Sequence, residues 1–110
     1  MGRISNQITK TDFSANGQTL VLNVEASDSV RFEFSGVYAF TAVFEATVDN
    51  VVWFPFLATR PDTAATSLSH LTANATQAYE ASCKTVAKVR ARLTAFTSAG
   101  THKVLITSAE

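Results

Sequence analysis

The chain has 110 residues, no formal net charge, 46% hydrophobic residues and 16% charged residues. This length predicts one domain with a single core, and the apolar content argues against intrinsic disorder. Balanced charge disfavours binding to nucleic acid or to an anionic membrane, and neither a membrane-spanning apolar run nor a signal peptide is evident.

Threonine and serine are frequent, with 15 and 10 residues, beside eight phenylalanines and many valines. Branched and aromatic side chains suit a pleated surface, so the composition predicts an all-β fold. We expect the polar residues 1–12 to form an N-terminal arm and residues 13–110 to form a β-sandwich.

The first expected strands cover residues 19–24, 30–34 and 38–48, where every second side chain is apolar. Turns are expected at Asn16-Gly17 and Ser35-Gly36. In the third strand, large and small residues alternate on the inward face, which lets two facing sheets interdigitate. That face carries Tyr38, Phe40, Ala42, Phe44, Ala46 and Val48.

The middle of the chain predicts a hairpin followed by a loop. Asp49-Asn50 favours a two-residue turn, because both residue types tolerate a positive φ angle. The next strand, residues 51–57, contains Pro55, which cannot donate a ladder hydrogen bond and therefore indicates an edge or a bulge. Residues 58–74 lack a clear period and predict a loop, with a short strand around 67–71.

The last expected strands cover residues 77–82, 85–96 and 102–108. A helix over residues 72–92 is rejected, because residues 86–93 alternate too regularly, but a short helix before Cys83 stays open. In all, seven or eight strands are expected. This number and spacing predict a single antiparallel β-sandwich, with either a jelly-roll or an immunoglobulin-like strand order.

The residues that carry catalytic chemistry are few. Neither His70 nor His102 has the spacing of a metal-ligand motif, and no phosphate-binding loop or nucleophile elbow is present. Cys83 has no cysteine partner and no recognisable base motif, which is typical of a small core residue. We therefore expect no enzymatic activity, no metal and no cofactor.

The strongest charged feature is the outward stripe Lys88, Arg90 and Arg92. We favour a solvated sheet face over a nucleic-acid site, and an acidic protein partner stays open. Acidic side chains that would balance the stripe across strands are Glu25, Glu33 and Glu45.

Trp53, Phe54 and Phe56 place aromatic side chains on both faces of one strand. A strand that is apolar on both faces near a sheet edge is typical either of a subunit interface or of an internal core. Both interpretations stay open from the sequence.

Three stretches resemble a family of small virion proteins of tailed bacteriophages. They are residues 40–56 (FTAVFEATVDNVVWFPF), residues 89–101 (VRARLTAFTSAGT) and residues 104–109 (VLITSA). The resemblance covers roughly residues 35–110. One departure is Asn50, which stands where the family pattern usually has glycine.

The resemblance implies a β-sandwich that belongs to a phage particle. Because the sandwich fills nearly the whole chain, we expect a capsid decoration or cement subunit, located in the virion after assembly in the host cytoplasm. Expected partners are further copies of the chain, as a homotrimer, and the major capsid protein or other virion subunits. The alternative is a carbohydrate- or host-surface-binding module of a head spike, tail fibre or baseplate, with Trp53 or Tyr38 exposed at a groove. Candidate interface residues are Arg3, Lys10, Trp53, Phe54, Phe56, Arg60, Lys88, Arg90 and Arg92.

Overall fold

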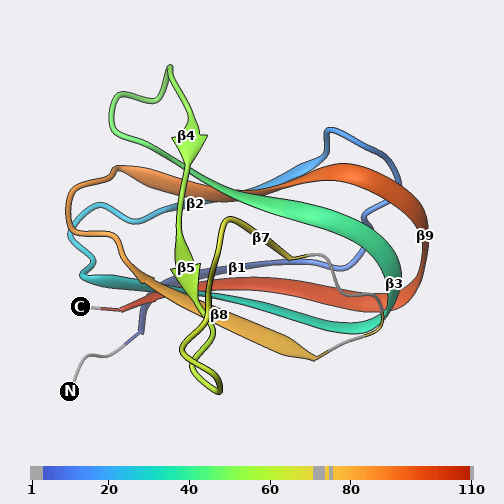
Figure 1. The fold of residues 1–110 in the computed structure, drawn as a ribbon. Coiled ribbons are helices and arrows are strands. Elements are labelled where there is room, and N and C mark those ends of the chain that lie inside the picture. The colour runs from blue at the N-terminus through green and yellow to red at the C-terminus, as the bar shows by residue number, and fades with distance from the viewer. Residues whose placement is uncertain (1–3, 71–73, 75, 110) are drawn as a thin grey trace.

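The computed structural model describes residues 4–70, 74 and 76–109, and over these residues it contains nine strands and no helix. The strands form one continuous antiparallel sheet that is folded over on itself (Figure 1). The prediction of an all-β antiparallel fold is therefore confirmed. The strands are β1 (Ile4–Lys10), β2 (Thr19–Asn23), β3 (Ser29–Thr47), β4 (Phe54–Pro55), β5 (Ala58–Thr59), β6 (Thr66–Ser67), β7 (Ser69–His70), β8 (Gln77–Ser82) and β9 (Lys88–Ala109).

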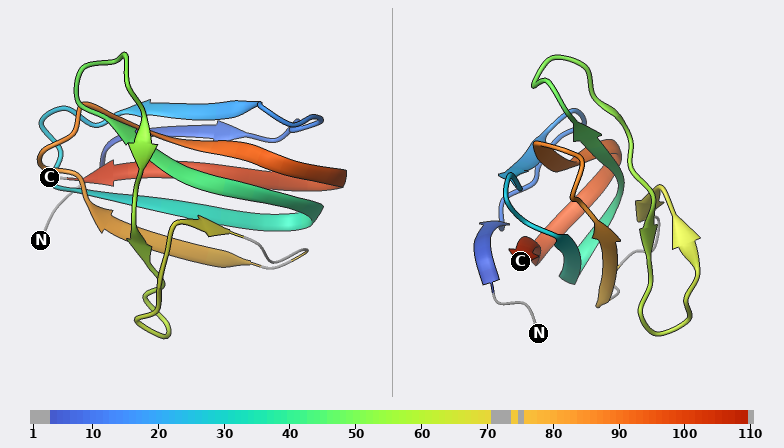
Figure 2. Two further views of the ribbon diagram at one scale, coloured as in Figure 1. Left: turned by 45° about the horizontal axis from the view of Figure 1, so that its top comes forward. Right: turned by 90° about the vertical axis from the view of Figure 1, so that its left-hand side faces the viewer.

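The frame of the molecule is a two-stranded ribbon made by β3 and β9. These strands pair antiparallel from Ser29↔Ala109 to Thr47↔Lys88. Halfway along, both strands curve round together, which lays one half of the ribbon over the other (Figures 1 and 2). Four separate strands were expected here from the sequence. That expectation was wrong because pairing continues through the bend, where Gly36 lies opposite His102.

Gly36 makes the bend sterically feasible. Its φ angle is +98°, a conformation that L side chains rarely adopt, and a Cβ atom there would lie 2.6 Å from the Cα atom of His102. The register of β3 on β9 also shifts three times between residues 36 and 42. Such bulges let a paired ribbon bend sharply without losing its ladder on either side.

Folding the ribbon creates two layers with the core between them. The first layer contains β1, the end of β9, the start of β3 and β8, and the second contains β2, the start of β9 and the end of β3. Phe32 from the first layer and Phe44 from the second meet with ring centroids 4.6 Å apart. The alternation predicted for residues 38–46 is confirmed, because all five inward side chains are buried.

Several local expectations were wrong. Within the expected arm, residues 4–10 form β1 and pair with β9, so this segment belongs to the sheet. Val48 is exposed because β3 ends at Thr47. The segment before Cys83, where a short helix stayed open, is the strand β8.

Replacement of Gly36 by alanine is expected to lower the free energy of unfolding by roughly 2–4 kcal/mol, because the added Cβ meets backbone atoms at a positive φ angle. Urea denaturation measures the change. Gly17→Ala is the matched control, since Gly17 also has a positive φ angle (+85°) but a Cβ atom added there would meet nothing within 4 Å beyond its chain neighbours. That control is expected to lose only about 1 kcal/mol. Equal losses in the two variants would contradict a steric role for Gly36.

Candidate interaction surfaces

The segment between β3 and β4 is an ordered loop that projects from the second layer (Figures 1 and 2). Asp49 organises it: its Oδ1 atom accepts hydrogen bonds from the backbone amides of Val51 (2.9 Å) and Val52 (3.0 Å). These two amides lower the pKa of the Asp49 carboxyl below its usual range. Asn50 adopts the positive φ angle, 66°, that the sequence predicted for this turn. The turn is nevertheless longer than the expected two-residue hairpin, because pairing with β3 resumes only at Phe54.

The loop and the segments that follow it hold most of the exposed large apolar side chains of the described residues. Val51 is the most exposed, at 77% of its full surface. Val48, Val51 and Val52 lie close together on the loop, and exposed apolar side chains that gather in one patch often mark an interaction site. The apolar surface, as we name it, comprises Val48, Val51, Val52, Phe54, Leu57 and Leu68.

A small apolar groove of about 240 Å³ lies next to this surface. It forms because the free edge of β3 is covered by two short pieces of chain: Phe44 accepts a hydrogen bond from the amide of Phe56 and donates one to the carbonyl of Leu68. Between these pieces the edge is left partly open. The residues lining the groove are Val43, Phe44, Glu45, Pro55, Leu68, Ser69 and Arg92.

A charged cluster forms one wall of the groove. Glu45 on β3 accepts hydrogen bonds from Arg90 Nε (2.7 Å) and from Arg92 Nε and Nη2 (2.9 and 3.0 Å). The hydrogen bond from Arg92, with that from Arg90, lowers the pKa of Glu45 against the opposing effect of burial. The Arg90 guanidinium also lies 4.1 Å from the centre of the Trp53 ring. One carboxylate therefore accepts hydrogen bonds from two guanidinium groups. Because two positive charges face one negative charge, the cluster has a net positive charge.

Four of the predicted interface residues are brought together here: Trp53 at the end of the loop, Phe54 at the start of β4, and Arg90 and Arg92 on β9. Lys88 lies at the start of the same stripe and is half-buried. Of the three glutamates expected to balance the stripe, Glu45 is the one that accepts hydrogen bonds from Arg90 and Arg92.

The remaining predicted interface residues lie elsewhere. Phe56 is buried in the core and packs against Phe32. Lys10 pairs with Asp12 at 2.9 Å, and Arg60 pairs with Asp62 at 3.0 Å in the loop between β5 and β6. Arg3 lies outside the described residues.

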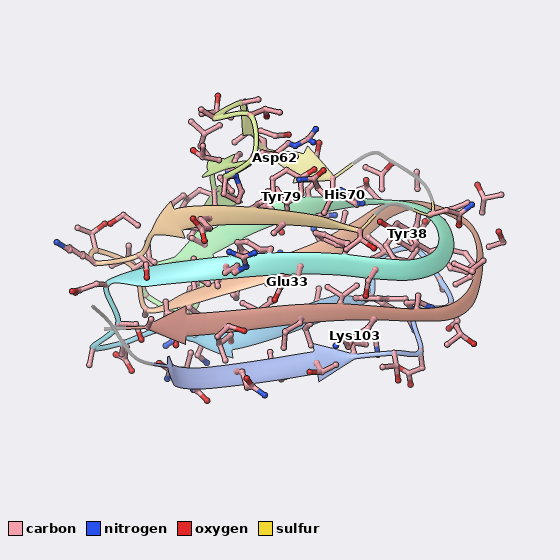
Figure 3. The ribbon with its side chains drawn as sticks, turned by 90° about the horizontal axis from the view of Figure 1, so that it is seen from below. Glu33, Tyr38, Asp62, His70, Tyr79 and Lys103 are labelled. Atoms are coloured by element: carbon pink, nitrogen blue, oxygen red, sulfur yellow. The ribbon has the colours of Figure 1, made fainter. Side chains whose placement is uncertain are left out.

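A second, polar groove of about 370 Å³ lies between that loop and the outer face of the first layer. Figure 3 shows Glu33 on β3, Lys103 on β9 and Asp62 in the loop beyond β8. The sequence placed Glu33 on an outward face but gave no signal for Asp62, because it joins the groove only through the path of the loop. The lining residues are Arg31, Glu33, Phe34, Ser35, Pro61, Asp62, Thr76, Gln77, Ala78, Lys103 and Leu105.

His70 lies in the core rather than at either groove. Its Nε2 and Nδ1 atoms are 2.6 Å and 2.9 Å from the hydroxyl oxygens of Tyr38 and Tyr79, and its ring stacks on Phe34 (Figure 3). Satisfied polar groups of this kind fix the position of a strand in a core, here β7. Tyr38 is buried, so the expectation that it could be exposed at a ligand groove was wrong.

His102 and Cys83 are likewise buried. His102 Nε2 accepts a hydrogen bond from the amide of Phe13 (3.2 Å), and its Nδ1 donates to the carbonyl of Gly100 (2.8 Å). Burial raises the pKa of the Cys83 thiol, whose sulfur lies 3.6 Å from the carbonyl of Ser27. Across residues 4–70, 74 and 76–109 there is no cluster of three or more histidine, cysteine or acidic side chains placed to hold a metal ion. The same part of the chain has no helix that is long and apolar enough to cross a membrane.

Two solved structures share this fold. SPBc2 prophage-derived protein YomS matches with a TM-score of 0.74 and 16% identity, over 96% of this chain and 94% of that chain. PBSX exported protein XepA matches with a TM-score of 0.72 and 18% identity, over 98% of this chain and 40% of that one. The chain thus spans less than half the length of XepA. No protein-family model and no curated protein sequence matches the chain.

A Glu45→Gln variant tests the charged cluster. At neutral pH it is expected to lower the free energy of unfolding by about 1–3 kcal/mol, because two guanidinium groups lose an ionised acceptor. The pKa of Glu45 is lowered by folding, so its contribution is present above the unfolded-state pKa and is lost as the pH falls through the folded-state pKa. The difference between variant and wild type should therefore shrink under acidic conditions.

Urea denaturation at neutral and acidic pH measures both effects. The control is Glu80→Gln, which removes the exposed ion pair with Arg31 and is expected to cost no more than about 1 kcal/mol. A Glu45→Gln loss that does not change with pH would contradict an electrostatic role for Glu45.

Proposed function

We propose that this chain is a non-enzymatic structural protein of a bacteriophage particle, and more narrowly a capsid decoration subunit. The observation that carries the proposal is the apolar surface, of which Val48, Val51 and Val52 lie on an ordered loop where a partner can cover them. The fold supports it as well, because YomS, which shares it over nearly its full length, is described as prophage-derived.

The proposed mechanism is mechanical. A subunit that binds the assembled head lattice, but not its free subunits, stabilises that lattice by mass action. Association of the decoration subunits with one another, as the expected homotrimer, then multiplies weak contacts through avidity. The burial of His70, His102 and Cys83 in core contacts supports the absence of catalytic chemistry in this proposal.

The test is binding to phage heads. Mature heads are prepared from the phage that encodes the chain, and the protein is stripped from them. Purified wild-type chain is then added to these stripped heads and, separately, to proheads. The chain is expected to co-sediment with mature heads to a saturating copy number and to raise the temperature at which they break open. Proheads serve as the control and should bind far less. A chain that stays at the top of the gradient with both particles contradicts the decoration proposal.

The polar groove favours a second candidate, a carbohydrate- or host-surface-binding module. Its mixture of carboxylates, a lysine and an amide offers many hydrogen-bonding groups to a polar ligand. A glycan array probed with wild type and with a Glu33→Ala, Asp62→Ala double variant tests it. Selective binding by the wild type that the variant loses would support this candidate, and an array without signal would contradict it.

A further inference from the structure

We propose that the chain associates with a second copy of itself by placing the Val51 loop of one copy in the apolar groove of the next. The inference rests on the proposed structural role and names the partner of the apolar surface. The loop supplies a projecting apolar knob and the groove between Pro55 and Leu68 supplies a hollow, so one chain carries both halves of the contact.

Both sides of the proposed contact, the loop and the groove, present apolar side chains. Val51 and Val52 are exposed on the loop, and Leu68 and Pro55 border the groove, with Phe44 of the core below them. Covering these side chains removes apolar area from water on both copies, which is the main favourable contribution to most protein association. The hydrogen bonds from Val51 and Val52 to Asp49 hold the loop in shape beforehand, so little conformational entropy is lost on docking.

The charges also match. Asp49 brings a negative charge on the loop, and only its Oδ1 atom accepts hydrogen bonds within the described part of the chain. The groove brings the net positive cluster, in which Arg92 uses Nε and Nη2 on Glu45, while Nη1 makes no hydrogen bond among the described residues. Asp49 Oδ2 of one copy therefore complements Arg92 Nη1 of the next. Because the whole chain has no net charge, two copies do not repel each other at long range.

The contact joins two different patches, which makes it heterologous. Passed from copy to copy, such a contact closes into a ring when the rotation between copies closes and otherwise forms an open filament, whereas two copies that exchange loops form an isologous pair. The polar groove shares no lining residue with the apolar groove, so the proposed contact does not use it.

Light scattering after size exclusion, at several concentrations, measures the association. The wild type is expected to have a mass that is a multiple of 11.8 kDa. A Val51→Asp, Val52→Asp double variant and a Leu68→Asp variant are each expected to be monomers, because each puts a carboxylate into the apolar contact. Val37→Asp is the matched control: it alters an exposed valine at the bend and should leave the association unchanged.

Mixing the two monomeric variants tests the geometry. The loop variant keeps an intact groove and the groove variant keeps an intact loop, so one sound contact is expected to form between them. The mixture should then yield a 1:1 complex, although neither variant associates alone. Circular dichroism and urea denaturation confirm that each variant is folded, as expected for substitutions of exposed side chains.

The outcomes are decisive in either direction. A wild type that stays at 11.8 kDa up to millimolar concentration overturns the inference, as does association that survives the loop variant. A mixture that stays monomeric overturns the loop-to-groove arrangement. Failure of head binding by a chain that does associate would instead contradict the decoration role and leave this contact standing.

Discussion

The bend of the β3–β9 ribbon is the constraint on which the rest of the structure depends. A two-stranded ribbon of this length cannot bury its apolar side chains while it stays extended, because each half needs a facing layer. Gly36 and the adjacent bulges supply that layer by turning the ribbon back over itself. Phe32 then reaches Phe44 across the core, and the short strands β2 and β8 complete the two layers.

The same ribbon determines the surface chemistry. Continuous register on the far side of the bend sets Glu45 opposite Arg90 and Val43 opposite Arg92, so the charged cluster follows from pairing within the ribbon. Within the described part of the chain, the other edge of β3 is covered in this region by the short strands β4 and β7 alone. The apolar groove is the gap that these two strands leave.

Local alternation was enough to predict the all-β fold, the inward face of residues 38–46 and the strand over residues 77–82. The missing backbone donor of Pro55 indicated an edge or a bulge, and Pro55 lies on the short strand β4 beside β3. Local alternation could not predict the single bent ribbon, because turn-like residues such as Ser35-Gly36 have the same pattern in a loop and in a paired bulge. Of the residues around the apolar groove and its charged cluster, Trp53, Phe54, Arg90 and Arg92 were predicted from the sequence. Leu68 was not predicted from the sequence, because the exposure of its side chain depends on which short segment covers the edge of β3.

The arrangement separates the residues that form the core from those of the proposed contact between copies. The core is formed by alternating side chains of the ribbon, and the hydrogen bonds that shape the projecting loop are made by Asp49 within the loop itself. Val51 and Val52 contribute only their backbone amides to that network, so their side chains are available to a partner without loss of a core contact. Substitutions at these two positions should therefore change association with little effect on stability, which is the behaviour that separates an assembly surface from an exposed part of a core.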